Sequence, residues 1–408
     1  MLKLRTVAGV YAVWLVAIEV VFYVTYGKNE NILQLVVMAG CLPAALQLLL
    51  VGFNPYGLVG STKFALIFLA IILLSYIGNT WDYLPIVYFL NTVFLFGLAI
   101  IVAACPNPRL MPMIAAAFSL VNGAFLLYVN IAGEYLWGRL VAHDIEPNFW
   151  GVMGLGSAAA AFGFKNRVLG AAGFLIGLMT IYDASARGSL LGLVAGAGVI
   201  ALLWATQLRG YRLVGSLIAI AAAAMVFLAF SSLISDSVAN FVTDVMKLDD
   251  PMRGTGNGFT GRSDIWANVI DLWLKSPVLG VGFRQHEQIL ANVSAHNAYL
   301  AMLVDTGVFG LLLYIVMIGM ALLYSRSIAD PQARNVTLAA VIGYAVLGFF
   351  ERRAINGGNP YGVLFLMCCF YPLVQHELQA ARSRLERTAA SLEQSARIRR
   401  AGFIGAVR

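Results

Sequence analysis

The sequence predicts an all-α integral membrane protein with about twelve transmembrane helices. Hydrophobic residues make up 60% of the 408 residues and charged residues only 12%, whereas soluble domains are about 45–50% apolar and about 25% charged. A soluble fold has no interior large enough for this excess, so most of the apolar surface must face lipid. The apolar runs are continuous rather than alternating, which excludes a lipid-facing sheet.

Apolar runs of roughly the length of a membrane span recur along the chain. The first run follows Lys3 and Arg5. A signal peptide is the alternative, but the run is about a full span long and lacks a clear small-residue cleavage site, so we interpret it as an uncleaved helix. The predicted spans are 7–26, 31–51, 63–78, 83–104, 110–130, 149–164, 167–183, 188–206, 212–235, 297–325, 335–350 and 361–376.

The basic residues predict the orientation of the chain. With a cytoplasmic N-terminus, the cytoplasmic connectors and the tail hold 17 of the 27 Lys and Arg residues, as the positive-inside rule requires. Both termini are then cytoplasmic, and the long loop between the ninth and tenth helices, about 236–296, lies outside. We expect a transmembrane domain over 1–376 and a basic, helical cytoplasmic tail over 377–408.

Composition also bears on partners and cofactors. The net charge of +7 does not indicate nucleic-acid binding, because the charge lies in short connectors and the tail. For the tail we favour contact with anionic membrane lipid over protein docking. The segment 143–146 (His-Asp-Ile-Glu) is a weak metal candidate, because consecutive ligands rarely share one ion. The cysteines suggest packing thiols rather than a disulfide framework: Cys41, Cys105, Cys368 and Cys369.

Histidines in the outer loop are the main candidates for acid–base chemistry. Ser294 is a plausible N-cap that would place His296 in the first turn of the tenth helix, where the helix dipole disfavours imidazolium. A neutral imidazole there accepts a proton at neutral pH, although an interfacial capping residue is an equal alternative. Asp305, nine residues on, faces the opposite side of that helix and is a poor partner for His296. For His286 we favour a position at the loop surface over assistance to His296.

Several arginines are predicted on the outer side, where the positive-inside rule disfavours them. One explanation is diphosphate binding, because guanidinium pairs bidentately with phosphate oxygens. The other is pairing with outer acids such as Asp183, Asp264 and Glu351, which we favour slightly for any single arginine. For a set that converges on one outer pocket we favour anion binding. Glu19, inside the first span, is a further site candidate unless it reaches the interface or pairs with another helix.

Several sequence segments resemble the O-antigen ligase and polymerase superfamily. Gly-Arg-x-x-Ile-Trp at 261–266, Ser-Pro-Val-Leu-Gly-Val-Gly-Phe at 276–283 and His-Asn-Ala-Tyr-Leu at 296–300 are similar to its motifs. The histidine motif continues with Gly-Val-Phe-Gly at 307–310, and Ser-Ala-Arg-Gly at 185–188 resembles the arginine motif before the eighth helix.

The resemblance implies a GT-C-like membrane glycosyltransferase of the bacterial inner membrane. Such proteins move a glycan from undecaprenyl diphosphate to a hydroxyl acceptor at the periplasmic face. A ligase uses a sugar of lipid A–core and completes lipopolysaccharide, and a polymerase uses the end of another lipid-linked repeat. The resemblance implies no cofactor, neither nucleotide nor metal ion.

Roles follow for individual residues. His296 would take the proton of the acceptor hydroxyl as it attacks the anomeric carbon, so one displacement would invert the anomer. Asn297 would hold a sugar hydroxyl or fix the imidazole, and Ser185 would support the arginine motif. The diphosphate would be bound by arginines, with the first two as primary ligands: Arg187, Arg262, Arg284 and Arg352.

Two other classes of protein are alternatives. A transporter of polysaccharide or lipid-linked glycan is also polytopic, but it usually has broken helices or inverted repeats with polar sites at the midplane. Here the polar residues gather at one face and in one loop. A structural membrane scaffold leaves the outer arginines unexplained. The sequence therefore favours chemistry at the outer surface.

Overall fold

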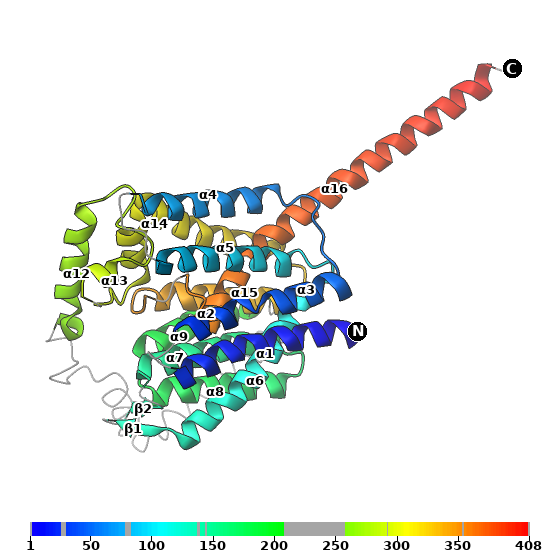
Figure 1. The fold of residues 1–408 in the computed structure, drawn as a ribbon. Helices are drawn as coiled ribbons and strands as arrows, with labels where there is room; N and C mark the ends of the chain where they lie inside the picture. Colours follow the sequence, from blue (N-terminus) through cyan, green and yellow to red (C-terminus); the bar gives the residue numbers. More distant parts are fainter. Residues whose placement is uncertain are drawn as a thin grey trace.

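The computed structural model describes residues 2–25, 30–77, 83–136, 139–142, 145–207, 258–291, 293–352 and 355–406. Within these ranges the chain forms a bundle of α-helices with one short β-hairpin (Figure 1). The ninth predicted span, at 212–235, lies outside the described residues. So do residues 236–257 and 292 of the outer loop and the His143–Asp144 pair of the weak metal candidate.

The elements follow the chain in this order. Before the hairpin come α1 (Leu2–Thr25), α2 (Glu30–Met38), α3 (Cys41–Leu50), α4 (Val59–Ser75), α5 (Tyr83–Ala103) and α6 (Leu110–Ala132). The antiparallel hairpin is β1 (Glu134–Leu136) and β2 (Arg139–Val141). Then come α7 (Pro147–Ala160), the 3₁₀ turn Ala161–Gly163, α8 (Arg167–Asp183) and α9 (Arg187–Gln207). The last group is α12 (Gly258–Leu274), α13 (His286–Ile289), α14 (Ala298–Tyr324), the 3₁₀ turn Ser325–Ser327, α15 (Pro331–Leu347) and α16 (Pro360–Ala406).

Among the described residues, six helical segments are long and apolar enough to cross a membrane. Their length matches the ~20 residues that a bilayer requires. The chain is therefore an all-α membrane protein. The six segments are Leu2–Thr25, Asn31–Leu50, Pro85–Ala103, Leu110–Ala132, Arg187–Ala205 and Ala298–Ser327.

The second predicted span, 31–51, is interrupted in the middle, which the sequence prediction missed. Helix α2 ends at Met38 and α3 starts at Cys41. Pro43 has no N–H to donate to the carbonyl four residues earlier, and its ring clashes with that carbonyl. Gly40 lies directly on the Trp14 indole, where any Cβ would overlap the ring. The Trp14 indole N–H donates to the Val36 carbonyl at 2.8 Å and holds the interruption against α1.

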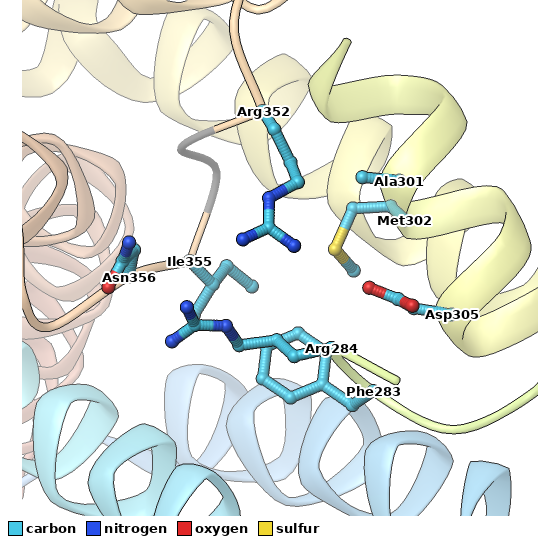
Figure 2. A pocket seen from close by; sticks show the side chains of 8 residues that line it. All are labelled: Phe283, Arg284, Ala301, Met302, Asp305, Arg352, Ile355 and Asn356. Atoms are coloured by element: carbon cyan, nitrogen blue, oxygen red, sulfur yellow. The ribbon is translucent and has the colours of Figure 1, made fainter. Parts of the chain in front are cut away.

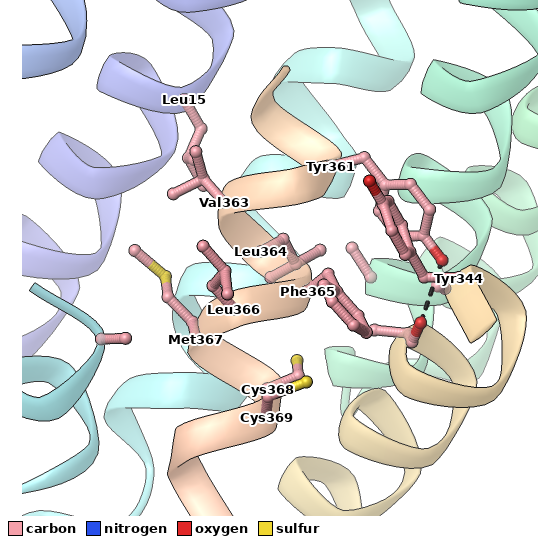
Figure 3. Packing of buried hydrophobic residues seen from close by; sticks show 14 of the residues in the cluster. Leu15, Tyr344, Tyr361, Val363, Leu364, Phe365, Leu366, Met367, Cys368 and Cys369 are labelled. Carbon is pink, nitrogen blue, oxygen red and sulfur yellow. Dashed lines mark hydrogen bonds between the residues drawn. The ribbon is translucent and has the colours of Figure 1, made fainter. Parts of the chain in front are cut away.

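The first turns of α16 form the centre of the bundle (Figure 3). Tyr344 of α15 stacks on Phe365 of α16, with 4.2 Å between ring centroids. The Tyr361 hydroxyl donates to the Ala340 carbonyl at 3.1 Å, so a buried phenol is satisfied. Cys368 and Cys369 are buried among these side chains, and Cys105 is also buried. Cys41 is exposed on the bundle surface, within the candidate span Asn31–Leu50, and does not pack in this core.

Helix α16 continues past residue 376 without a break and projects from the bundle (Figure 1). The helix predicted for the tail is therefore present up to Ala406. The N-terminus of α1 lies at this same end of the bundle, whereas α12, α13 and the hairpin lie at the opposite end (Figure 1).

Glu19 lies in the C-terminal half of α1 and is completely buried. When the Asn122 side-chain amide on α6 is oriented to donate, its nitrogen contacts both carboxylate oxygens of Glu19, with Oε1 at 3.2 Å. Glu19 thus has a hydrogen-bond partner on another helix, which is the pairing alternative considered from the sequence.

Candidate functional site

The head of α14 carries His296, but the cap differs from the predicted one. Asn297, not Ser294, is the N-cap, and its side chain accepts from the Tyr299 and Leu300 amides at 2.9 and 3.0 Å. His296 therefore precedes the helix instead of lying in its first turn. Its φ of 45° is left-handed, a conformation that histidine tolerates better than most residues. Its amide N–H donates to Ser294 Oγ at 3.4 Å.

Helix α12, which lies inside the predicted outer loop, brings Arg262 to the head of α14. The sequence prediction treated this segment as a polar connection and missed the helix. Trp266, one turn after Arg262 on α12, donates from its indole nitrogen to the Ala295 carbonyl at 2.9 Å. Val269 and Leu272 of α12 pack in a small hydrophobic cluster that includes Ala295.

The connection after α15 also contacts the head of α14 and the side chain of Arg262. The Ala298 amide donates to the Gly348 carbonyl at 2.7 Å, and Arg262 Nη1 donates to the Phe350 carbonyl at 3.0 Å. His296 and Arg262 are therefore held at one corner between α12, the head of α14 and residues 348–351. We call this arrangement the outer corner.

A chain of polar contacts crosses the outer corner. Arg262 Nη2 lies 3.9 Å from the Glu351 carboxylate, which is the acid-pairing alternative for this arginine. Glu351 also accepts from the Asn148 side-chain Nδ2 at 2.9 Å, and the Asn148 side-chain Oδ1 accepts from Arg139 Nη2 at 2.8 Å. Arg139 Nε donates in turn to the Ala184 carbonyl at 3.0 Å. These bonds tie α12 to the hairpin and to the α8–α9 turn.

The α8–α9 turn carries Arg187 and Ser185. Ser185 is buried and left-handed, with φ 46°. Gly188 packs so closely on Phe350 that an added Cβ would lie 2.7 Å from the Phe350 Cβ. The N-terminus of α9, where Arg187 is the first residue, therefore lies beside the connection at residues 348–351, which also contacts Arg262. On the adjoining hairpin, burial and the neighbouring Asp183 carboxylate raise the pKa of Tyr135.

Arg284 and Arg352 lie together in a separate cavity (Figure 2). The cavity has a volume of about 20 Å³, room for about one water molecule, and is partly open to solvent. The Arg284 guanidinium lies 4.1 Å from the centroid of the Tyr88 ring. Arg352 is paired with Glu287 at 2.6 Å. The lining residues are Phe283, Arg284, Ala301, Met302, Asp305, Arg352, Ile355 and Asn356.

His286 is fully buried, so the predicted surface position is wrong. Its Nδ1 lies 2.7 Å from Asp305 Oδ1, and its backbone amide donates to the same oxygen at 3.2 Å. Within the described residues its Nε2 has no hydrogen-bond partner. Helix geometry predicted that Asp305 is a poor partner for His296. In the structure the Asp305 carboxylate contacts His286 instead. The signal that the sequence offered for this pair was His286 itself, because it is the second histidine of the outer loop and Asp305 faces away from His296.

The tenth predicted helix, 297–325, is broken at Gly307, whose φ and ψ are 67° and −171°. The break frees backbone groups that residues 276–283 satisfy. The Val281 and Gly282 amides donate to the Val304 and Asp305 carbonyls at 2.9 and 3.0 Å, and the Val308 amide donates to the Pro277 carbonyl at 3.0 Å. Two sequence motifs, at 276–283 and 307–310, are thus two halves of one backbone clamp.

The His286–Asp305 pair predicts a large stability effect. We expect Asp305→Ala to lower the free energy of unfolding by about 3 kcal/mol, because it leaves a buried imidazole without its partner. Thermal unfolding of the purified protein in detergent measures the loss. Asp264→Ala, at an exposed position of α12, is the control and should unfold at the wild-type temperature. Equal melting of the Asp305 variant and wild type would show that the pair contributes little.

The fold, the outer corner and the cavity with Arg284 and Arg352 together define a helical membrane protein that has arginines and a histidine at one end of its bundle. Residues 172–315 match the family model for O-antigen ligase, which confirms the resemblance to the O-antigen ligase superfamily over this segment. The match contains His296, Arg187, Arg262 and Arg284, and it ends before Arg352. It supports a ligase- or polymerase-type function of a glycosyltransferase-like enzyme that uses lipid-linked glycans. No curated protein matches the chain.

Proposed function

We propose that this protein is a glycosyltransferase that joins O-antigen to lipid A–core in lipopolysaccharide synthesis. The donor is a glycan on undecaprenyl diphosphate, and the acceptor is a sugar hydroxyl at the periplasmic face. The observation that carries the proposal is the outer corner: inside the segment that matches the O-antigen ligase family, a histidine and an arginine distant in sequence are held together.

The proposed topology is GT-C-like, with twelve spans in the bacterial inner membrane. Both termini are cytoplasmic, the loop at 236–296 is periplasmic, and the chain divides into a transmembrane domain at 1–376 and a tail at 377–408. The arrangement of the bundle supports this topology, because the N-terminus and the α16 extension lie at the end opposite α12 (Figure 1). The Arg-rich tail would contact the anionic cytoplasmic lipid surface.

Departure of the lipid diphosphate is the step that needs positive charge. Negative charge grows on the leaving oxygen as the glycosidic bond breaks, and cations held in place stabilise it without reorganisation. Arg187 and Arg262 fill this role, because both adjoin the 348–351 connection beside His296. In the resting structure Glu351 helps to hold the Arg262 side chain. Arg284 and Arg352 add positive charge from the neighbouring cavity.

His296 acts as the general base. It takes the proton of the acceptor hydroxyl while that oxygen attacks the anomeric carbon, and the diphosphate leaves from the opposite face, so the anomer is inverted. Asn297 supports this role by capping α14, which fixes the backbone next to the imidazole. Ser185 holds the turn that starts the helix of Arg187. The mechanism uses no metal ion and no nucleotide.

The fork of the Arg187 guanidinium gives a specific prediction. We expect Arg187→Lys to lower the transfer rate by roughly 10- to 100-fold, because lysine keeps the charge but cannot bind two phosphate oxygens in parallel. The rate is measured on purified protein at saturating acceptor. Arg109→Lys, before α6 and away from the outer corner, is the matched control. Full activity of the Arg187 variant would leave this arginine a purely structural role.

A product analysis separates the ligase from its closest alternative, an O-antigen or exopolysaccharide polymerase. The purified protein is incubated with lipid-linked glycan, with and without lipid A–core, and the products are resolved by mass. Glycan attached to lipid A–core, formed only when that acceptor is present, supports the ligase. Lengthened lipid-linked chains in its absence would instead assign the polymerase reaction.

A further inference from the structure

We propose that a groove at the end of the bundle opposite the outer corner binds the phosphate-bearing headgroup of an anionic membrane lipid. The groove has a volume of about 570 Å³, is open to solvent and is lined by residues 3–4, 50–51 and 106–109. We call it the basic groove. It lies at the end from which α16 projects (Figure 1), far from the proposed transfer site, so its test does not require activity.

The basic groove lies where four candidate membrane spans begin or end. Leu2–Thr25 and Leu110–Ala132 begin beside it, and Asn31–Leu50 and Pro85–Ala103 end beside it. Lipid headgroups occupy the layer directly outside the hydrocarbon core, so the groove is at their level. Basic pockets between transmembrane helices on the cytoplasmic side are typical binding sites for anionic headgroups. The proposed topology places this end of the bundle in the cytoplasm.

Both charged side chains of the basic groove are cations. Lys3 and Arg109 come from distant chain segments, and neither is paired with an acid within the described part of the chain. Asn107 Oδ1 accepts from the Arg109 backbone amide at 3.0 Å, which leaves the donor Nδ2 of Asn107 to a ligand. Ammonium, guanidinium and amide nitrogens donate, and phosphate oxygens accept. The lining therefore matches a phosphate group.

The apolar walls of the groove favour a lipid over a free phosphate ion. Leu4, Leu50 and Val51 line it together with the cations. Leu49, next to this lining, is 83% exposed near the end of the span Asn31–Leu50. The apolar surface thus continues from the groove along α3, where the acyl chain of a lipid packs. A free ion would leave this surface uncovered, whereas burial under a lipid is favourable.

Buried hydrogen bonds hold the walls of the basic groove together. The Tyr11 hydroxyl of α1 donates to Gln47 Oε1 of α3 at 2.8 Å, and Gln47 Nε2 donates to the Ile101 carbonyl of α5 at 2.8 Å. On the other side, the Tyr371 hydroxyl of α16 donates to the Pro108 carbonyl at 3.0 Å. The groove is therefore preformed, which lowers the entropy lost when a ligand binds.

Lipid binding to the purified, delipidated protein tests this inference. Native mass spectrometry follows titrations with phosphatidylglycerol, with phosphatidylcholine of the same acyl chains and with inorganic phosphate. We expect one phosphatidylglycerol to bind about 10-fold or more tightly than either other ligand, because only it combines negative charge with an acyl chain. Lys3→Gln and Arg109→Gln should each weaken this binding roughly five-fold, and together about 10- to 30-fold, since each removes one cation.

The matched control is the double variant Lys63→Gln/Arg167→Gln. It removes one exposed lysine and one exposed arginine from α4 and α8, so it lowers the net charge equally. Its affinity for phosphatidylglycerol should stay within about two-fold of wild type, because both positions lie outside the groove. Arg109→Lys keeps the charge in the groove and should keep most of the binding. Phosphatidylglycerol should raise the melting temperature of wild type and control, but less that of the groove double variant.

Three results would overturn the proposal. Equal losses of affinity in the groove and control variants would show general attraction to a basic surface. Equal binding of phosphatidylglycerol and phosphatidylcholine would show that charge does not decide. Inorganic phosphate that binds through Lys3 and Arg109, without tighter binding of phosphatidylglycerol, would identify a free anion site instead of a lipid site.

Discussion

His296→Ala is expected to abolish detectable transfer while the protein still folds and inserts. Loss of a general base alone lowers a rate by about 10²- to 10⁴-fold. The backbone of His296 is left-handed, so alanine also adds local strain. His296→Asn avoids this complication, because asparagine tolerates the left-handed region and cannot act as the base. Both variants should be inactive, and the Asn variant should melt at the wild-type temperature.

The matched control for His296 is another histidine of the same chain. His376, just before the tail, stacks on Tyr324 with ring centroids 4.4 Å apart, and its Nδ1 lies 3.2 Å from Ser327 Oγ. These contacts give it a structural role. His376→Asn should retain activity. Wild-type-like transfer by His296→Asn would reject the general-base assignment and leave His296 as an interfacial residue.

Gly307→Ala is expected to have the largest effect on folding of any single substitution considered. The φ and ψ of Gly307, 67° and −171°, lie in a region that is essentially restricted to glycine and costs other residues ~1–3 kcal/mol. A Cβ at this position would also overlap the Val278 carbonyl. The clamp between residues 276–283 and the break in α14 would then have to open. We expect little folded protein in detergent, measured by size-exclusion chromatography and thermal unfolding.

Gly319 provides the control on the same helix. It lies in regular α-helix and a Cβ there meets no atom within 4 Å. Gly319→Ala should therefore be neutral or stabilising by up to about 1 kcal/mol, as expected for a helical glycine. If Gly307→Ala and Gly319→Ala unfold at the same temperature, the break at Gly307 does not hold the clamp together.

Most helices of the described fold follow from the apolar runs, because membrane spans have a strong and simple sequence signal. The interruption at Gly40 was missed because hydropathy does not weigh Pro43, and because its place also depends on Trp14, a residue of another helix. Helix α12 was missed for a different reason. Its sequence is polar enough to suggest a loop, and its stability comes from packing against α14. Hydropathy does not register such tertiary contacts.

The candidate site was predictable in its residue types but not in its pairings. The arginines and His296 were selected by charge, predicted side and motif, and Arg262 and His296 do lie at one corner. Arg284 and Arg352 lie in a different cavity, which no spacing along the chain reveals. The His286–Asp305 pair was missed because it depends on how the 276–283 segment wraps around the break at Gly307. The capping prediction failed because Ser294 and Asn297 are both good caps, and the left-handed His296 decides between them.

The most direct test of the account asks whether the protein forms a covalent product. Purified protein in detergent, without any membrane gradient, is given lipid-linked glycan and lipid A–core, and the products are analysed by mass spectrometry. We predict glycan covalently attached to lipid A–core, with release of undecaprenyl diphosphate. A different result, in which no product forms but the same protein moves lipid-linked glycan across the bilayer of a proteoliposome, would contradict the glycosyltransferase assignment and identify a transporter.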